Sequence, residues 1–135
     1  MSKESCKVLV VDEDRDNADT TVMLLHMWGH EAEPAYSDDD AISKARAFDP
    51  DVLLIDLGRP VVNGFDLAKE LRRYCPEAKL LAITGFTADD IVRRTRDAGF
   101  EKVLFKPTPA KRLQEAVETE CSAPSELTKS AESAA

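Results

Sequence analysis

The hydrophobic residues of the chain fall into two alternating patterns. One pattern consists of short apolar runs rich in β-branched residues, which predict strands. These runs are Lys7–Val11, Ala32–Tyr36, Val52–Ile55, Leu80–Thr84 and Val103–Phe105. From Val8 and from Val52 onward the runs are apolar continuously rather than alternately. Continuous apolar runs are typical of strands that are covered on both faces, as in a parallel sheet.

The segments between these runs carry apolar residues three and four positions apart, which is the spacing of an amphipathic helix. Helix-terminal signals agree with this pattern. Ser37 with Asp40, and Thr87 with Asp90, have the spacing of a capping box, and Gly99 stands where a helix beginning near Thr87 would end. The sequence therefore predicts five strand–helix units in succession.

This alternation predicts a doubly wound α/β fold, because parallel strands need helical crossovers. Five units in 135 residues suggest a flavodoxin-like five-stranded parallel sheet, (βα)5, with strand order 2-1-3-4-5. The alternation comes from the sequence, whereas the order is taken from known folds. We expect one domain over residues 5–121 and a disordered polar tail over residues 122–135, which is rich in Ser, Ala, Glu and Lys.

The charge balance narrows the classes of partner. A formal net charge of −8 argues against direct binding of DNA or RNA, which relies on basic patches. No apolar run approaches the roughly 20 residues of a membrane span, and the N-terminal segment lacks the ordered parts of a signal peptide. We therefore expect a cytoplasmic protein that binds neither nucleic acid nor membrane.

Cysteine and histidine offer little chemistry in this sequence. Cys6, Cys75 and Cys121 are odd in number, far apart and without a C-x-x-C pair. They fit neither a disulfide framework nor a zinc site, so we expect reduced thiols. His26 and His30 lie near the end of the first helical pattern, and we interpret them as surface or capping residues.

Polar residues stand at the carboxyl ends of four predicted strands, where open α/β sheets bind ligands. In chain order they are Asp12, Glu13, Asp56, Thr84, Gly85 and Lys106. Taken singly, each has an ordinary structural explanation, such as a helix N-terminus for the acids, strand propensity for Thr84 and a solvated surface for Lys106. In the assumed strand order, however, these ends are neighbours. Three carboxylates, a hydroxyl and an ammonium group should then share a small space.

Such a cluster is suited to phosphoryl chemistry. Carboxylates that repel one another are stabilised by a cation, and Mg²⁺ prefers oxygen ligands of this kind. An ionised Asp can act as a nucleophile toward phosphorus. The oxygens of a transferring phosphoryl group need to be neutralised, and Mg²⁺, an ammonium and a hydroxyl can do this together.

The sequence resembles the receiver domains of bacterial response regulators, in particular the single-domain, chemotaxis-regulator-like form. The resemblance covers about residues 5 to 120. The motifs that carry it are Val8–Glu13, Asp56–Pro60 followed by Asn63-Gly64, Ile83–Gly85, Ala98–Phe100 and Lys106-Pro107. It implies a response regulator of a two-component phosphorelay that acts through protein–protein contacts.

The resemblance also implies a role for individual residues. Asp56 would be the phosphoacceptor, and Lys106, Thr84 and the Gly85 backbone N–H would contact the phosphoryl oxygens. The Lys106–Pro107 bond would be cis, as X-Pro bonds can be. The domain would not be an enzyme in the usual sense. It would be a signalling phosphoacceptor that assists its own phosphotransfer and dephosphorylation.

The metal site implied by the resemblance consists of Asp12, Glu13, Asp56 and the Gly58 backbone carbonyl. It would hold Mg²⁺, for which Mn²⁺ would substitute. Glu13 stands where Asp is commoner in the family. Val103 stands where many relatives carry an aromatic residue that couples to the phosphoryl-bound Thr, so we expect a response concentrated in the loops beside the site.

The partners implied by the resemblance are a sensor histidine kinase or a histidine phosphotransferase, together with a downstream protein. Two alternatives stay within the family, namely a phosphorylation-independent interaction module and a receiver fragment of a hybrid sensor kinase. A third alternative is an unrelated small-ligand enzyme on the same fold. That alternative lacks a Gly-rich phosphate loop after the first strand.

Overall fold

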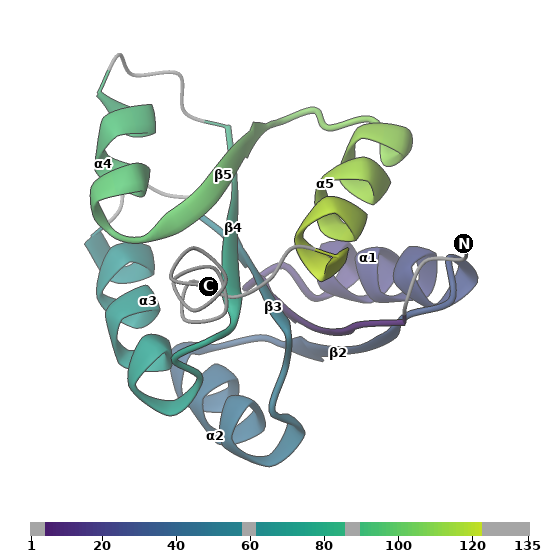
Figure 1. Ribbon diagram of the computed structural model, residues 1–135, viewed down its shortest axis with the longest axis horizontal. Coiled ribbons are helices and arrows are strands. Elements are labelled where there is room, and N and C mark those ends of the chain that lie inside the picture. Colours follow the sequence, from purple (N-terminus) through teal and green to yellow (C-terminus); the bar gives the residue numbers. More distant parts are fainter. Residues whose placement is uncertain (1–4, 58–61, 86–89, 123–135) are drawn as a thin grey trace, which may run out of the picture.

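The computed structural model describes residues 5–57, 62–85 and 90–122, and in this part of the chain five strands form one parallel sheet. The strands are β1 Lys7–Val11, β2 Glu31–Ala35, β3 Val52–Asp56, β4 Lys79–Thr84 and β5 Phe100–Phe105. Their order in the sheet is β2-β1-β3-β4-β5 (Figure 1). The predicted α/β class, parallel pairing and strand order are confirmed.

Helices cover both faces of the sheet (Figure 1). They are α1 Arg15–Met27, α2 Asp38–Phe48, α3 Val62–Tyr74, α4 Ile91–Asp97 and α5 Ala110–Ser122. α1 and α5 lie on one face, and α2, α3 and α4 lie on the other. This is the doubly wound arrangement, in which a helix connects each strand to the next strand along the chain.

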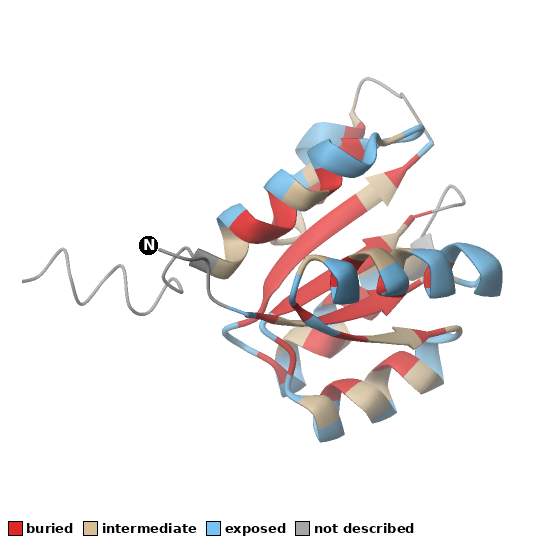
Figure 2. Cartoon of the chain, turned by 90° about the vertical axis from the view of Figure 1, so that its right-hand side faces the viewer, coloured by how far each residue is buried: buried red, intermediate tan, exposed pale blue. Residues whose placement is uncertain are grey.

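Each face of the sheet has its own hydrophobic core. Leu9 and Leu53 pack among the residues of α2 and α3, whereas Val8 and Leu54 pack among those of α1 and α5. Successive strand residues point to opposite faces, so a strand that is buried on both sides must be apolar throughout. Figure 2 shows the buried strands between helices whose outer sides are exposed. The continuous apolar runs of the sequence correspond to these strands.

The helix ends follow local signals where the structure describes them. Ser37 caps α2, since its Oγ accepts a hydrogen bond from the Asp40 N–H at 3.1 Å, as the capping-box spacing predicts. Gly99 follows α4 with a φ of 97°, a conformation that suits glycine. α4 begins at Ile91, and Asp90, the residue before it, makes no side-chain capping bond. The second predicted box stays a prediction, because Thr87 lies outside the described residues.

β5 begins at Phe100, three residues before the predicted start at Val103. The ladder between β4 and β5 has an irregularity between Leu80 and Leu81, so that Leu80 pairs with Phe100 and Leu81 with Lys102. This leaves Glu101 as an extra residue, as in a β-bulge. Both Glu101 and Lys102 are exposed. β5 is an edge strand, and charged residues there interrupt the apolar pattern without ending the strand.

The expectation of reduced thiols is wrong for two of the three cysteines. Cys6 and Cys121 form a disulfide with a Cα–Cα distance of 5.8 Å, which joins residues 115 positions apart. Cys75 is a free, buried thiol. Burial raises the pKa of the Cys75 thiol, and the charge of Asp49 adds to this effect.

The interpretation of His30 as a surface or capping residue is also wrong. His30 is buried, and its Nδ1 accepts a hydrogen bond from the Cys6 N–H at 3.3 Å. Nε2 therefore donates to Glu118 Oε2 of α5, at 3.2 Å. His26 is exposed, as expected, with Nε2 3.1 Å from the Ala32 carbonyl oxygen. The His30–Glu118 pair and the disulfide both attach α5 to the start of the chain.

None of the helices described has the combination of length and apolar character that a membrane crossing requires. The expected tail over residues 122–135 lies almost wholly outside the described residues. The domain boundary at residue 121 stays a prediction.

Candidate functional site

The strand register brings the predicted polar residues to one edge of the sheet. Val11 pairs with Ile55 at the end of β1 and β3, Asp56 pairs with Ile83 of β4, and Thr84 pairs with Phe105 of β5. Asp12, Asp56, Thr84 and Lys106 therefore stand at the carboxyl ends of four neighbouring strands. This edge is where open α/β sheets bind their ligands.

Asp56 and Lys106 form the centre of this site. Lys106 Nζ donates to Asp56 Oδ2 at 2.6 Å, although the two residues are 50 positions apart. The Asp56 side chain is 8% exposed, whereas that of Lys106 is 35% exposed. Within the described part of the chain, Asp56 Oδ1 is buried and accepts no hydrogen bond. One carboxylate oxygen is thus neutralised by an ammonium, and the other is a buried acceptor of the kind that is rarely left unpaired.

The pKa of Asp12 reflects its burial and the negative charges that lie close together at this edge of the sheet. Its pKa is raised from 3.8 to about 6, first by burial and then by the neighbouring Asp56 carboxylate. The Asp14 N–H, which donates to Asp12 Oδ1 at 2.9 Å, and the charge of Lys106 act in the opposite direction. Asp12 is therefore a carboxylate whose negative charge is incompletely compensated by the protein.

Glu13 is exposed, and its charge acts on Asp38 at the start of α2. The pKa of Asp38, at the start of α2, is raised by burial and then by the charge of Glu13. Among the described residues, no three acidic, histidine or cysteine side chains are arranged to hold a metal ion together. Gly58, the fourth predicted ligand, lies outside the described residues.

Thr84 is fully buried at the end of β4, and its hydroxyl donates to the Leu57 carbonyl oxygen at 3.3 Å. Gly85 follows it at an exposed position, where an added Cβ would meet no atom within 4 Å. The Lys106 N–H donates to the Thr84 carbonyl at 2.8 Å, and the Lys106–Pro107 bond is cis, as the resemblance implied. These contacts fix the ends of β4 and β5 beside Asp56.

Leu57 is a residue of the site that the sequence analysis missed. Its side chain is buried, its carbonyl accepts from Thr84, and its N–H donates to the Ile83 carbonyl at 2.7 Å. Its side chain also occupies the space where a Cβ on Gly64 would stand. An aliphatic residue after Asp56 gives no chemical signal in the sequence. The Asn63-Gly64 pair was the available hint, since glycine permits a close approach.

Comparison with known proteins identifies the family of this chain. The model of the response regulator receiver domain family matches residues 8–118. The chain is 36% identical over 107 residues to a response regulator receiver protein of Anaeromyxobacter sp. (strain Fw109-5). It is 30% identical over 118 residues to the transcriptional regulatory protein ZraR of Salmonella typhimurium. These matches cover 79% and 87% of this chain but 45% and 27% of the relatives, so the chain spans less than half of their length.

Solved structures show the same fold. The chemotaxis protein CheY4 of Vibrio cholerae superposes with a TM-score of 0.78 at 25% identity, covering 86% of this chain and 98% of that one. A CheY-like receiver domain of Methanospirillum hungatei gives a TM-score of 0.78 at 23% identity, covering 87% and 94%.

The strand order and the acidic edge define a CheY-like, flavodoxin-fold domain. Because the family model matches most of its length, the chain belongs to the response regulator receiver domain family. Receiver domains are signalling modules of two-component systems, and they interact with histidine kinases and downstream effectors.

Proposed function

We propose that this domain is a phosphoacceptor in which Asp56 receives a phosphoryl group in a Mg²⁺-dependent reaction. The observation that carries the proposal is the state of the Asp56 carboxylate, with Oδ2 held by Lys106 and Oδ1 buried and unpaired among the described residues. A carboxylate needs a free oxygen to attack phosphorus and a nearby cation to balance the charge that develops. In the part of the chain that the structure describes, Asp56 Oδ1 and the Lys106 ammonium offer both.

In the proposed step, Asp56 Oδ1 attacks the phosphorus of a phosphohistidine on a kinase or phosphotransferase. The new oxygen–phosphorus bond forms as the phosphorus–nitrogen bond breaks, and the electron pair of that bond stays on the imidazole. Lys106 then shifts its hydrogen bond from the carboxylate to a phosphoryl oxygen, joined there by the Thr84 hydroxyl and the Gly85 N–H. Hydrolysis reverses the modification, because attack of water on phosphorus breaks the bond to the Asp56 oxygen, releases inorganic phosphate and restores the carboxylate.

The residues present suit a hard cation. Asp12 has a raised pKa because of burial and the adjacent Asp56 charge, and an added positive charge would relieve both effects. Asp12 and Asp56 would hold Mg²⁺ or Mn²⁺, with Glu13 and the Gly58 carbonyl as further ligands. Two carboxylates with waters are a usual Mg²⁺ shell. The bound cation would supply charge neutralisation for the phosphoryl oxygens.

The proposed setting is cytoplasmic signalling through protein contacts. A histidine kinase or histidine phosphotransferase would supply the phosphoryl group, and a downstream protein would recognise the modified domain. We propose residues 5–121 as the receiver domain and residues 122–135 as a polar tail. A phosphorylation-independent interaction module, or a receiver that belongs to a hybrid sensor kinase, would preserve the fold but change this role.

The proposal is tested by incubation with acetyl phosphate and Mg²⁺, followed by intact mass spectrometry. The mass should rise by one phosphoryl group, and the gain should disappear with Asp56→Asn or with EDTA. Asp66→Asn is the matched control, because Asp66 is an exposed aspartate on α3. Labelling of Asp56→Asn at the level of the control would refute the assignment of Asp56.

A further inference from the structure

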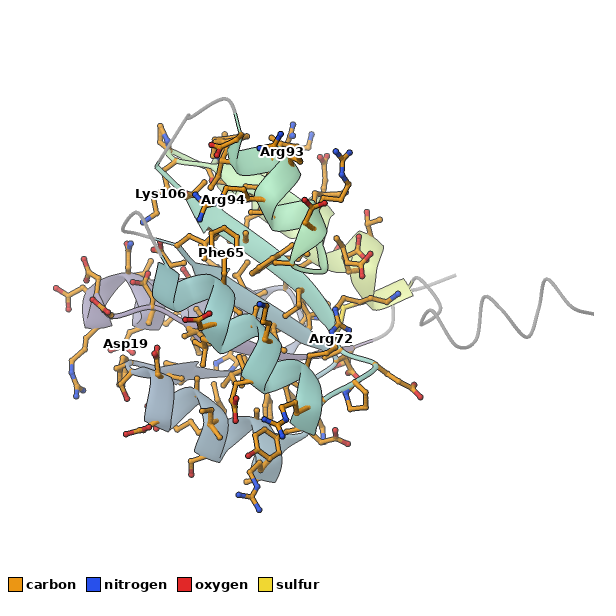
Figure 3. All side chains as sticks on the ribbon, turned by 90° about the vertical axis from the view of Figure 1, so that its left-hand side faces the viewer. Asp19, Phe65, Arg72, Arg93, Arg94 and Lys106 are labelled. Atoms are coloured by element: carbon orange, nitrogen blue, oxygen red, sulfur yellow. A yellow bond between two sulfur atoms is a disulfide. The ribbon has the colours of Figure 1, made fainter. Side chains whose placement is uncertain are left out.

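The ring of Phe65 joins three elements on the α3 and α4 side of the sheet. Phe65 belongs to the first turn of α3, and its ring meets the edge of Phe100 in β5, with centroids 6.2 Å apart and planes at 88°. The Arg94 guanidinium of α4 lies over the same ring, 4.9 Å from its centroid. Figure 3 shows Arg94 between Phe65 and Lys106 in that view. The ring is thus held between α4 and β5.

The first turn of α3 is linked directly to the phosphoacceptor strand. Gly64 lies so close to the Leu57 side chain that a Cβ on Gly64 would overlap it. Leu57 is buried and follows Asp56 in the chain. Closely packed side chains transmit displacements rather than absorb them. A movement of the Leu57 side chain when Asp56 is modified would therefore be passed to the turn that carries Phe65.

α4 is also connected to the phosphoacceptor site through β4. α4 follows β4, whose last residue, Thr84, donates its hydroxyl to the Leu57 carbonyl. Recruitment of the Thr84 hydroxyl by a phosphoryl group would remove this bond from Leu57. Val103 of β5 packs against the same core cluster as Phe65, but it has no ring. The aromatic contact to α4 comes from α3, through Phe65.

We infer that Phe65 and Arg94 are positioning residues that couple the state of Asp56 to α4. This inference rests on the proposed function, and it revises the expectation that the response is concentrated in the loops. The chain of contacts runs from Asp56 through Leu57 and Gly64 to Phe65, and from the ring to Arg94. When the ring shifts, the guanidinium follows it, because a cation over an aromatic face is attracted by the ring's quadrupole. α4 then presents a different surface to a partner.

The test compares the amide NMR spectra of metal-loaded protein with and without beryllofluoride. In the wild-type protein, residues 91–98 should shift together with the site. Arg94→Gln should weaken the coupling of α4 by roughly two- to fivefold, the range expected for an exposed cation–π contact. Phe65→Leu should have the same effect, whereas Phe65→Tyr, which keeps an aromatic face, should retain the wild-type response.

Arg93→Gln is the matched control, since Arg93 is an exposed neighbour on α4 that lies farther from the ring in Figure 3. An α4 response that is equal in Arg94→Gln and Arg93→Gln would overturn the inference, as would the absence of any α4 shift in wild-type protein that gains a phosphoryl group from acetyl phosphate. If wild-type protein gains no phosphoryl group and shows no beryllofluoride shift at Asp56, the proposed function itself fails. The mass measurement distinguishes failure of the proposed phosphorylation from failure of the coupling to α4.

Discussion

At the scale of single residues, the two neighbouring carboxylates of the site lie in different electrostatic environments. Asp56 is neutralised on one oxygen by Lys106, whereas Asp12 has a pKa raised to about 6 by burial and by the Asp56 charge. The protein therefore holds Asp12 in an environment that disfavours its ionised form. A group of this kind lowers stability at neutral pH and becomes useful when a cation binds.

Replacing Asp12 with Asn should stabilise the metal-free protein at neutral pH. Because the folded pKa of Asp12, about 6, exceeds the unfolded value of 3.8, the folded state binds the proton more tightly. The stabilisation from this proton is fully present below the unfolded pKa and is lost as pH rises through the folded pKa. Asn mimics the neutral form at every pH, so its advantage should be present at pH 7 and fade toward pH 4.

Thermal unfolding in EDTA at both pH values measures this effect. Asp16→Asn serves as the control, because Asp16 is an exposed aspartate in the first turn of α1. An equal difference between Asp12→Asn and wild type at the two pH values would contradict the role of Asp12 ionisation.

At the scale of elements, the first turn of α3 makes a close approach to the residue that follows Asp56. Gly64 stands against the buried Leu57 side chain, and an added Cβ would overlap it. The absence of a side chain at Gly64 therefore allows α3 to begin directly beside the phosphoacceptor strand. The same approach places Phe65 under Arg94.

Gly64→Ala should destabilise the domain by about 1–3 kcal/mol, the usual cost of overpacking a core. The loss arises because the added Cβ would overlap the terminal methyl of Leu57, which is buried and would have to shift within the core. Urea denaturation measures the free energy of unfolding. Gly85→Ala is the matched control, since a Cβ there meets no atom within 4 Å. Equal stability of the two variants would show that the first turn of α3 adjusts freely.

At the scale of the whole molecule, α5 closes the fold by returning to the start of the chain. Its Glu118 accepts from the buried His30 at the start of β2, and its Cys121 is bonded to Cys6 beside β1. Both links lie at the end of the sheet opposite to the edge that carries Asp56 and Lys106. They stabilise the domain without occupying the site.

Reduction of the Cys6–Cys121 disulfide should lower the free energy of unfolding. A link across 115 residues restricts the unfolded chain by about 5 kcal/mol in the loop-entropy description. Urea denaturation with and without reductant should show this loss in the wild-type protein. The double variant Cys6→Ser, Cys121→Ser should be insensitive to reductant, and Cys75→Ser should respond as the wild type does. A wild-type midpoint that reductant leaves unchanged would contradict a structural role.

The sequence alone determined the alternation of strands and helices and the placement of polar residues at the strand ends. Both follow from local patterns, because a strand buried on two faces must be apolar and a polar residue that ends the run must stand at its tip. Asp12, Asp56, Thr84 and Lys106 were therefore located before any contact between them was known. The strand order was taken from known folds, and the register then confirmed that these tips are neighbours.

Only the tertiary structure decided which distant residues meet. The disulfide spans 115 positions and the His30–Glu118 pair spans 88, and neither leaves a periodic signal in the sequence. The contact of Phe65 with Arg94 likewise depends on how α3 and α4 pack on the same face. Hydrophobic periodicity reports which face of an element is buried, but it does not report the partner that covers that face. For this reason the polar residues of the candidate site could be placed at the strand ends from the chain, whereas their contacts with the rest of the molecule required the fold.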